Sequence, residues 1–518
     1  MTAHQIANRS ERLTELSEPD SDCEECGRAD PSARIDALAR RGESRANAGW
    51  ICLMADEGRL KMGPQSLREL HEKGKSLRSS LPRVGHAELT LPDRDTVGLI
   101  SAQNESRLAD LVPVRIGRML QSPFAYYRGT AAVMAHDLAA AAVTGQRVVC
   151  CGDAHIANFG MFASPERRLL FDLTDFDEVS TAPWEWDVKR LAASVVIGGR
   201  EIGLSATACV ESATSAVAAY RTVLRELYSR TALERYFFQV ETDMLEKLVS
   251  PERRKVLTRT VKKARRRTSD QVLEKLVVVD DHGRQVIKDD PPIARHVGNV
   301  ELDTLRDLYE QYHRTMLPDT ALLMSQFRLV DFILRVVGVG SVGTRCFVLL
   351  FVGPAGEPLF LQAKEAPPSV LESHGREPTL IGERQSRISQ GERVVTGQRI
   401  LQAQSDPFLG WIESWGEGGG EPTDSYLRQF RDMKGSVDLT TLTGAEFQDY
   451  GRLCAAVLAR AHSQSPGGAV VDGYLGRSDQ FEMAVGHWAV QYADQAERDF
   501  KDLQSAVQHG RLPAEYGV

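Results

Sequence analysis

The sequence predicts a mixed protein of the α+β class. Apolar residues recur at helical spacing before about residue 230 and again after about residue 440. Between them, residues 329–366 contain short β-branched and aromatic runs separated by glycine and proline, which is typical of strands. Hydrophobic residues make up 42% of the chain and charged residues 26%, as in soluble globular proteins.

The 518 residues are enough for two to four domains. Residues 1–48 are charged and rich in turn formers, so we expect a mobile N-terminal extension there. Its lone Cys23 and Cys26 pair lacks the second pair that a structural zinc site needs. After it we expect a helical lobe (49–325), a strand-rich lobe (326–440) and C-terminal helices that pack on the helical lobe (441–518).

The overall charge argues against a general nucleic-acid or membrane binder. The formal net charge is −8 and the isoelectric point is near 5.9. No run of 18 apolar residues is present, and the first residues lack the apolar segment of a signal peptide. We therefore expect a cytoplasmic protein with neither nucleic acid nor membrane as a partner.

A buried helix is predicted near residue 135, from the spacing of Met134, Leu138 and Ala142 and from a closing Gly145. Arg128 follows an aromatic stretch just before it. Core packing with an ion pair is the favoured interpretation of that group. The alternative is an arginine that faces phosphate groups, which its guanidinium can bind in a bidentate manner.

Two predicted strands lead into clusters of hard oxygen donors. Residues 148–151 run into Asp153, which is followed by Asn158, and residues 169–173 lead to Asp175, Asp177 and Glu178. Such donors suit Mg²⁺. In phosphoryl transfer one Asp accepts the nucleophile's proton, while an Asn and a second Asp hold the metal. Asp153 fits the role of the base, and Asn158, Asp175 and Asp177 fit that of metal ligands. Each of the two short segments by itself is also an ordinary turn sequence.

The segments that follow are predicted from periodicity. Residues 187–229 form two helices by their apolar stripe. The basic run 253–267 is interpreted as a solvated helix face. Residues 275–289 form a strand, a turn and a second strand.

Gly338, Gly340 and Gly343 spell GxGxxG, which invites a dinucleotide-binding interpretation. That interpretation needs a helix after the glycines. Residues 346–352 instead predict a strand, so the glycines, with Ser341, resemble a turn that covers ATP phosphates.

A third strand, 358–366, carries Lys364, which we expect to contact the α- and β-phosphates. In such sites the lysine pairs with a glutamate on the next helix. Glu383 and Glu392 are both candidates, and Glu392 is preferred because the helical pattern continues from it.

The last part predicts strands at 408–412 and 426–431. The connector 432–436 is a candidate for contacts with adenine. Thr443 and Glu446 form a capping box. It opens a helix that ends near His462, and a final amphipathic helix spans about 481–503.

The motif GDAHIAN, the later DFD and the WEWD segment together resemble the catalytic loop and metal-binding segment of aminoglycoside phosphotransferases and other kinase-like enzymes. The resemblance implies that Asp153 is the base and that Asn158 and Asp175 are metal ligands. It also implies that Asp187 is the structural aspartate that opens the next helix. Cys151 stands where those enzymes usually carry histidine.

The order of the motifs is reversed, since in kinase-like enzymes the glycine-rich loop and lysine come first. The resemblance therefore implies a circularly permuted, two-lobed kinase-like fold with the catalytic loop first. Longer strings, among them RIGRMLQSPFAYYRGTAA, VVGVGSVGTRCFVLL and YLRQFRDMKGS, resemble the bacterial family called domain of unknown function 2252 over roughly residues 75–505. Thr396 stands where an acidic residue is expected in that family.

The expected function is an ATP- and Mg²⁺-dependent phosphotransferase whose acceptor is an unknown molecule, small by analogy with the fold. Transfer of AMP to protein on the same site and a catalytically silent ATP sensor are alternatives. A dinucleotide-dependent oxidoreductase rests on GxGxxG alone. The leading hypothesis requires Asp153 and Lys364 to face one cleft.

Overall fold

The computed structural model describes residues 65–243, 254–266, 269–297, 302–336, 338–377, 388–415, 423–430 and 433–517. Residues 66–518 form one unit, to which the following description applies. The predicted N-terminal extension, Cys23, Cys26 and Glu383 lie outside the described residues.

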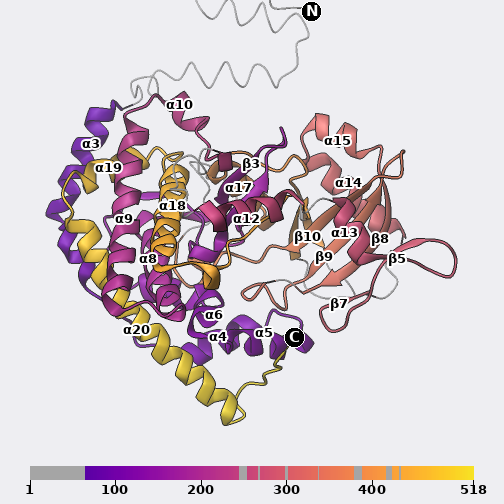
Figure 1. Ribbon diagram of the computed structural model, residues 1–518, viewed down its shortest axis with the longest axis horizontal. Helices are drawn as coiled ribbons and strands as arrows, with labels where there is room; N and C mark the ends of the chain where they lie inside the picture. Colours follow the sequence, from indigo (N-terminus) through magenta and orange to yellow (C-terminus); the bar gives the residue numbers. More distant parts are fainter. Residues whose placement is uncertain are drawn as a thin grey trace, which may run out of the picture. The chain divides into compact units, whose positions relative to one another are not determined.

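A bundle of long helices forms the largest core (Figure 1). Its central member, α8 (Trp184–Glu201), is buried along almost its whole length, because other helices pack around it. These are α9 (Ala206–Tyr228), α18 (Gly444–His462) and α20 (Gln480–Gln508). Helix α19 (Gly468–Leu475) packs on α9 and on α3 (Leu67–Ser76).

Shorter helices complete the unit. They are α4 (Thr96–Asn104), α5 (Val112–Met119), α6 (Pro123–Arg128), α7 (Ala131–Leu138), α10 (Ala232–Tyr236), α12 (Arg254–Arg265), α13 (Ser269–Leu276), α14 (Leu302–Thr315), α15 (Pro318–Met324), α16 (Val370–Ser373) and α17 (Gln390–Leu401).

Two short antiparallel pairs lie against the helical bundle. Strand β1 (Arg147–Cys150) pairs with β4 (Ser180–Pro183), and β2 (Phe159–Ala163) pairs with β3 (Leu169–Leu173). The segments after β1 and after β3 carry the predicted acidic cluster, so these pairs set its position.

A six-stranded antiparallel sheet forms the second part, in the order β11-β12-β10-β9-β8-β7. Its strands are β7 (Ala294–Arg295), β8 (Arg328–Arg335), β9 (Cys346–Val352), β10 (Pro358–Glu365), β11 (Gly410–Trp415) and β12 (Thr423–Gln429). A separate hairpin joins β5 (Val277–Val279) to β6 (Gln285–Ile287).

Side chains alternate between the two faces of the six-stranded sheet, as the strand repeat requires. Phe351 and Leu361 join a cluster with residues of α14 and α15 on one face. Leu350 and Phe360 join a cluster with residues of α13 and β6 on the other. Because both faces are covered, the strands read as nearly continuous apolar runs.

The observed elements confirm the α+β class and correct several details. The glycines at 338–343 connect β8 to β9, so the dinucleotide-binding interpretation of GxGxxG is wrong. The helix predicted up to Gly145 ends at Leu138. Beyond this end, the N–H of Thr144 donates to the buried Glu185 carboxylate at 2.7 Å instead of to the carbonyl oxygen of a preceding helical turn.

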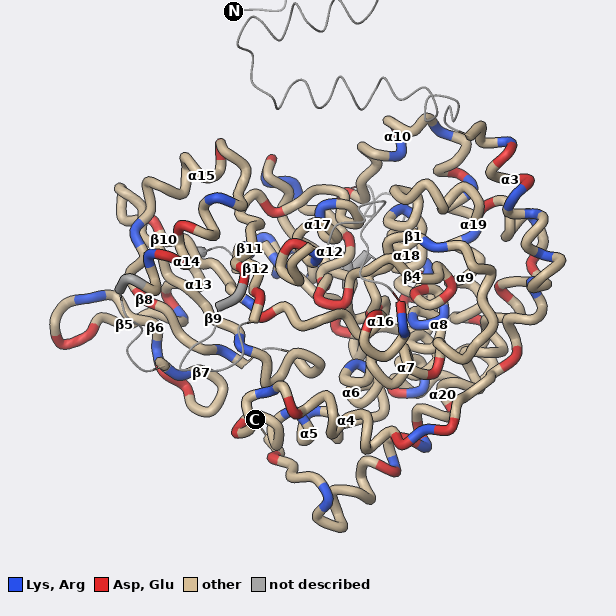
Figure 2. Tube along the Cα trace, turned by 180° about the vertical axis from the view of Figure 1, so that it is seen from behind, with Lys and Arg blue, Asp and Glu red and all other residues tan. Residues whose placement is uncertain are grey.

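The basic run forms helix α12, as predicted. Val261 and Ala264 are buried, whereas Lys262, Lys263 and Arg265 are exposed. Figure 2 shows acidic and basic residues interspersed over the helical part and the sheet. Among the described helices, none has the length and apolar character needed to cross a membrane.

The capping box at α18 gives a test of the fold. The Thr443 hydroxyl accepts the N–H of Glu446, and the Glu446 carboxylate accepts the N–H of Thr443. Thr443→Ala should lower the free energy of unfolding by about 1 kcal/mol, because a helix-end N–H loses its partner. Urea denaturation followed by circular dichroism measures this. Thr443→Ser is the control and should stay near the wild type; equal stability of all three proteins would contradict the cap.

Candidate functional site

The loop after β1 is fixed by a buried aspartate on α8. The Asp187 carboxylate accepts the N–H groups of Cys151 at 2.7 Å and Gly152 at 3.0 Å. Gly152 has φ +78°, and a Cβ there would lie 2.2 Å from the carbonyl oxygen of Glu178. Only glycine suits this position, so the loop makes close contact with the segment that follows β3.

Asp187 also accepts from His462 at the end of α18, with Nε2 3.2 Å from Oδ2. Cys150, Asp187 and His462 lie close enough together to resemble a metal site. Their polar atoms are already used, however: Asp187 by two N–H groups, and the Nδ1 of His462 by the Tyr220 hydroxyl at 2.8 Å. This cluster therefore joins α18 to the loop as a structural element.

Asp153 is held by one arginine. Arg190 of α8 contacts its Oδ1 through Nε at 2.9 Å and through a second nitrogen at 2.8 Å. Both of these contacts go to Oδ1, whereas Oδ2 lies 3.6 Å from His155 Nε2, beyond hydrogen-bond distance. Oδ2 is therefore the oxygen that can accept a proton. Burial raises the pKa of Asp153 above the ordinary value, although Arg190 and Arg128 oppose that rise.

Asn158 and Asp175 both offer oxygens to a cation. The side-chain amide nitrogen of Asn158 donates to the carbonyl oxygen of Asp153 at 2.8 Å, which leaves its side-chain oxygen for another partner. The Oδ1 atom of Asp175 is buried and finds no hydrogen-bond partner among the residues that the structure describes. Burial and then the neighbouring Asp177 raise the pKa of Asp175. A bound divalent cation would satisfy this oxygen and relieve the repulsion.

Asp177, another of the predicted metal ligands, does not have the environment expected of a metal ligand. It forms an ion pair with Lys364 of β10, and its other oxygen accepts the Tyr426 hydroxyl at 2.7 Å. The Ser341 hydroxyl in the glycine turn lies 3.2 Å from Asp177 Oδ2. Asp177 thus links the sheet and the glycine turn to the segment after β3.

In the pair of Asp177 and Lys364, each charge stabilises the charged form of the other side chain. Burial by itself would raise the pKa of Asp177, but Lys364 and the Tyr426 hydroxyl together lower it to about 2. Burial disfavours the charged lysine, yet Asp177 raises the pKa of Lys364 above the ordinary value. Both side chains are therefore charged at neutral pH.

Helix α17 contributes an arginine to this segment. Arg393 is fully buried and donates to the carbonyl oxygens of Asp177 at 2.9 Å, Val179 at 2.6 Å and Pro367 at 2.8 Å. Its neighbour Glu392, the predicted partner of Lys364, lies in the first turn of α17 and is not among the described residues that line the cavity below.

The glycine turn is docked against the helices that precede β1. Gly338 and Gly343 have φ of +68° and +88°, which accounts for glycine at both ends of the turn. Arg118 donates to the carbonyl oxygen of Gly338 at 2.6 Å, and Arg107 donates to that of Val342.

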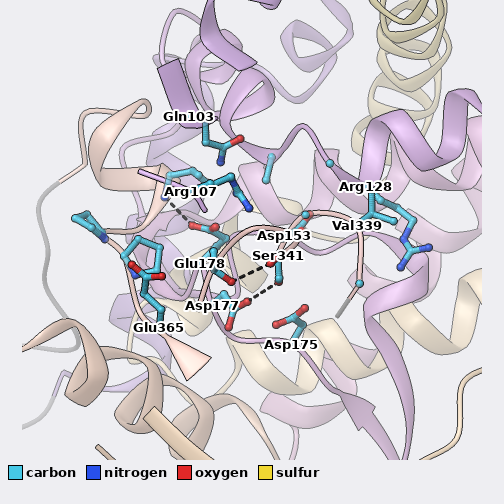
Figure 3. A pocket seen from close by; sticks show the side chains of 18 of the residues that line it. Gln103, Arg107, Arg128, Asp153, Asp175, Asp177, Glu178, Val339, Ser341 and Glu365 are labelled. Atoms are coloured by element: carbon cyan, nitrogen blue, oxygen red, sulfur yellow. Dashed lines mark hydrogen bonds between the residues drawn. The ribbon is translucent and has the colours of Figure 1, made fainter. Parts of the chain in front are cut away.

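A cavity of about 330 Å³ lies where these parts meet. Asp153, Asn158, Asp175 and Asp177 line it together with Lys364. Gly338, Gly340 and Ser341 also line it, whereas Gly343 does not belong to the lining. Figure 3 shows Asp153, Asp175 and Asp177 around Ser341 in this cavity. The requirement that Asp153 and Lys364 face one cleft is therefore met.

Two lining residues, Arg107 and Glu365, were not assigned a role from the sequence. No local pattern marks them, because their place in the cavity depends on how the elements pack. Glu178, one of the predicted oxygen donors, lines the same cavity. Burial raises the pKa of Glu178 to about 7, although its carboxylate accepts the N–H of Val370 at 2.7 Å.

The connector that was predicted to contact adenine already uses some of its backbone groups in hydrogen bonds within the protein. Gly435 exchanges two backbone hydrogen bonds with Met161 of β2, at 2.7 and 2.8 Å. Its N–H and C=O groups are therefore used within the protein. Beside it, Arg428 and Lys434 line a second cavity of about 250 Å³, and burial lowers the pKa of Lys434 to about 7.

The fold and site define an α+β protein in which one acidic cavity lies between a helical bundle and an antiparallel sheet. Over residues 107–506 the chain matches the model of a family described as "Uncharacterized protein conserved in bacteria (DUF2252)". The chain belongs to that family, as its long motifs predicted. No curated protein and no solved structure matches it.

The Asp187 contacts predict a large loss of stability for Asp187→Ala. Two buried N–H groups and His462 would lose their partner, so we expect the free energy of unfolding to fall by about 3 to 5 kcal/mol. Urea denaturation measures it. Asp494→Ala removes a half-exposed carboxylate that pairs with Arg200, and it should change stability by about 0.5 kcal/mol or less. Similar losses in both variants would contradict the role of Asp187.

Proposed function

We propose that this protein is an ATP- and Mg²⁺-dependent phosphotransferase that acts on a small-molecule acceptor. One observation carries the proposal. Side chains suited to a base, to metal ligation and to phosphate contact come from distant parts of the chain and line one cavity, beside a glycine turn between two strands. Phosphoryl transfer needs little beyond such positioning and charge neutralisation.

Asn158 and Asp175 are the proposed Mg²⁺ ligands. Both are hard oxygen donors, and the unpartnered buried Oδ1 of Asp175 fits a cation. Asp177 is instead assigned as the residue that positions Lys364, because both of its oxygens are already engaged. When bound, Mg²⁺ would neutralise charge on the phosphates.

The proposed step is transfer of the γ-phosphoryl group to an acceptor hydroxyl. Asp153 Oδ2 accepts the hydroxyl proton as the new oxygen–phosphorus bond forms. The bond between the γ-phosphorus and the bridging oxygen breaks, and ADP leaves with that electron pair. Lys364 contacts the phosphates as a point charge, and Ser341 and the glycines cover them.

A permuted kinase-like fold is part of the proposal. The sheet places the Lys364 strand β10 beside β9, which follows the glycine turn, and α17 follows β10 in the chain. Asp187 binds the backbone of the catalytic loop from a helix, as the resemblance implies. Helix α18 contacts β1, in agreement with a helix that precedes the loop in space.

Nucleotide binding is the first test. Isothermal titration of the full chain with ATP should show Mg²⁺-dependent binding. Lys364→Met and Asp175→Asn should each weaken it by about tenfold or more, since each removes a charge-assisted contact. Arg200→Met, which removes an arginine from a partly exposed ion-pair group on α8, is the control and should bind like the wild type. A folded wild-type protein that binds no ATP would refute the proposal.

Catalysis is tested separately with Asp153→Asn. We expect it to bind ATP and Mg²⁺ about as well as the wild type and to lose at least about 100-fold in transfer, because the base is removed. Extracts of small molecules incubated with ATP labelled at the γ-phosphate give the readout. Label transferred only from the α-phosphate would favour AMP transfer. Wild-type binding without any transfer would favour a silent sensor.

A further inference from the structure

Arg128 stands out among the residues that line the cavity. It ends helix α6, and the described residues offer its buried Nε atom no hydrogen-bond partner. Lys364 has Asp177. The Nε atom of Arg107 also lacks a hydrogen-bond partner among the described residues, but another nitrogen of Arg107 donates to the carbonyl oxygen of Val342 and so ties this side chain to the glycine turn. Burial lowers the pKa of Arg128, but Asp153 and Asp175 oppose this, so the side chain remains charged. Arg128 is therefore a cation whose donors are available inside the site.

The backbone on each side of Arg128 is fixed by a buried arginine. Arg190, which also holds Asp153, donates to the carbonyl oxygen of Tyr127 at 2.8 Å. Arg115, which is fully buried, donates to that of Gly129 at 2.9 Å. Because Arg190 contacts both Asp153 and Tyr127, the base and the segment that carries Arg128 share one support. Such an arrangement keeps the geometry of a site fixed before ligand binds.

Arg128 also lies against the glycine turn. A Cβ on Gly340 would be 3.3 Å from the carbonyl oxygen of Arg128. Figure 3 shows Arg128 near Val339, with Asp153 and Asp175 in the same cavity. In the proposed function the glycine turn covers the outer phosphates of ATP. The acceptor hydroxyl lies beside Asp153, and the Mg²⁺ ion lies beside Asp175. The transferred phosphorus must lie between the nucleophile and the metal-bound phosphates, which is the region that Arg128 borders.

We propose that Arg128 is a catalytic residue that binds the γ-phosphate and stabilises the phosphoryl group during transfer. The proposal rests on the function proposed above and adds a residue to it. A guanidinium suits this task because it stays charged and donates two parallel hydrogen bonds to phosphate oxygens. It would act as an arginine finger supplied by the same chain.

The test compares ATP with ADP, which lacks the γ-phosphate. Isothermal titration in the presence of Mg²⁺ is performed on the wild type, Arg128→Met and Arg128→Lys. We expect Arg128→Met to weaken ATP binding by about 10- to 100-fold and to leave ADP binding within about threefold. Arg128→Lys should recover part of the loss. Arg200→Met removes an arginine from a partly exposed ion-pair group and should change neither affinity.

The possible outcomes separate this inference from the proposed function. Unchanged ATP affinity in a folded Arg128→Met protein would overturn the role of Arg128 and leave the phosphotransferase proposal standing. Equal losses for ATP and ADP would also overturn it, because the contact would then not involve the γ-phosphate. Absence of binding by the wild type would refute both. A second readout is ADP with fluoroaluminate, a mimic of the transferred group, whose added affinity should disappear in Arg128→Met.

Discussion

The ion pair between Asp177 and Lys364 is the contact on which the site depends. It joins the segment after β3 to strand β10, although 187 residues separate the two in sequence. Tyr426 and Ser341 contact the same carboxylate, so β12 and the glycine turn meet at this point. Because both charges are buried, loss of either would leave an unpaired charge, which is a severe cost. The cavity therefore lies at a junction where the segment after β3, the sheet and the glycine turn share one carboxylate.

Buried arginines extend this organisation through backbone carbonyl groups. Arg393 fixes the chain at Asp177 and Val179, Arg190 connects Asp153 to α6, and Arg115 fixes the turn after α6. A guanidinium can satisfy several carbonyl oxygens at once, which suits segments that lack regular secondary structure. Asp153 is consequently held by Arg190 from outside the cavity, while Oδ1 of Asp175 has no hydrogen-bond partner among the described residues. That division of roles supports a site built for a cation and an anionic substrate.

Much of the site could be predicted because its motifs are local. Gly152, Asp153 and Asn158 follow one strand and Asp175 another, so periodicity and turn residues placed them at strand ends. Lys364 was placed on β10 because the glycine turn is followed by two strands separated by a turn, the second of which carries it. The end of the early helix was mispredicted at Gly145: α7 ends at Leu138, and the N–H of Thr144 beyond it bonds to the distant Glu185 carboxylate instead of to a helical carbonyl oxygen. Local propensity cannot include such a partner.

The sequence by itself determined the element types, the family and the polar residues of the loop after β1, because these depend on spacing within short segments. Only the tertiary structure decided that Asp177 pairs with Lys364, that the glycine turn docks on the helices before β1, and that Arg128 enters the cavity. Each of these is a contact between residues that are distant in the chain. Helical and strand periodicity show which face of an element is buried, whereas the partner on that face is set by how the elements pack.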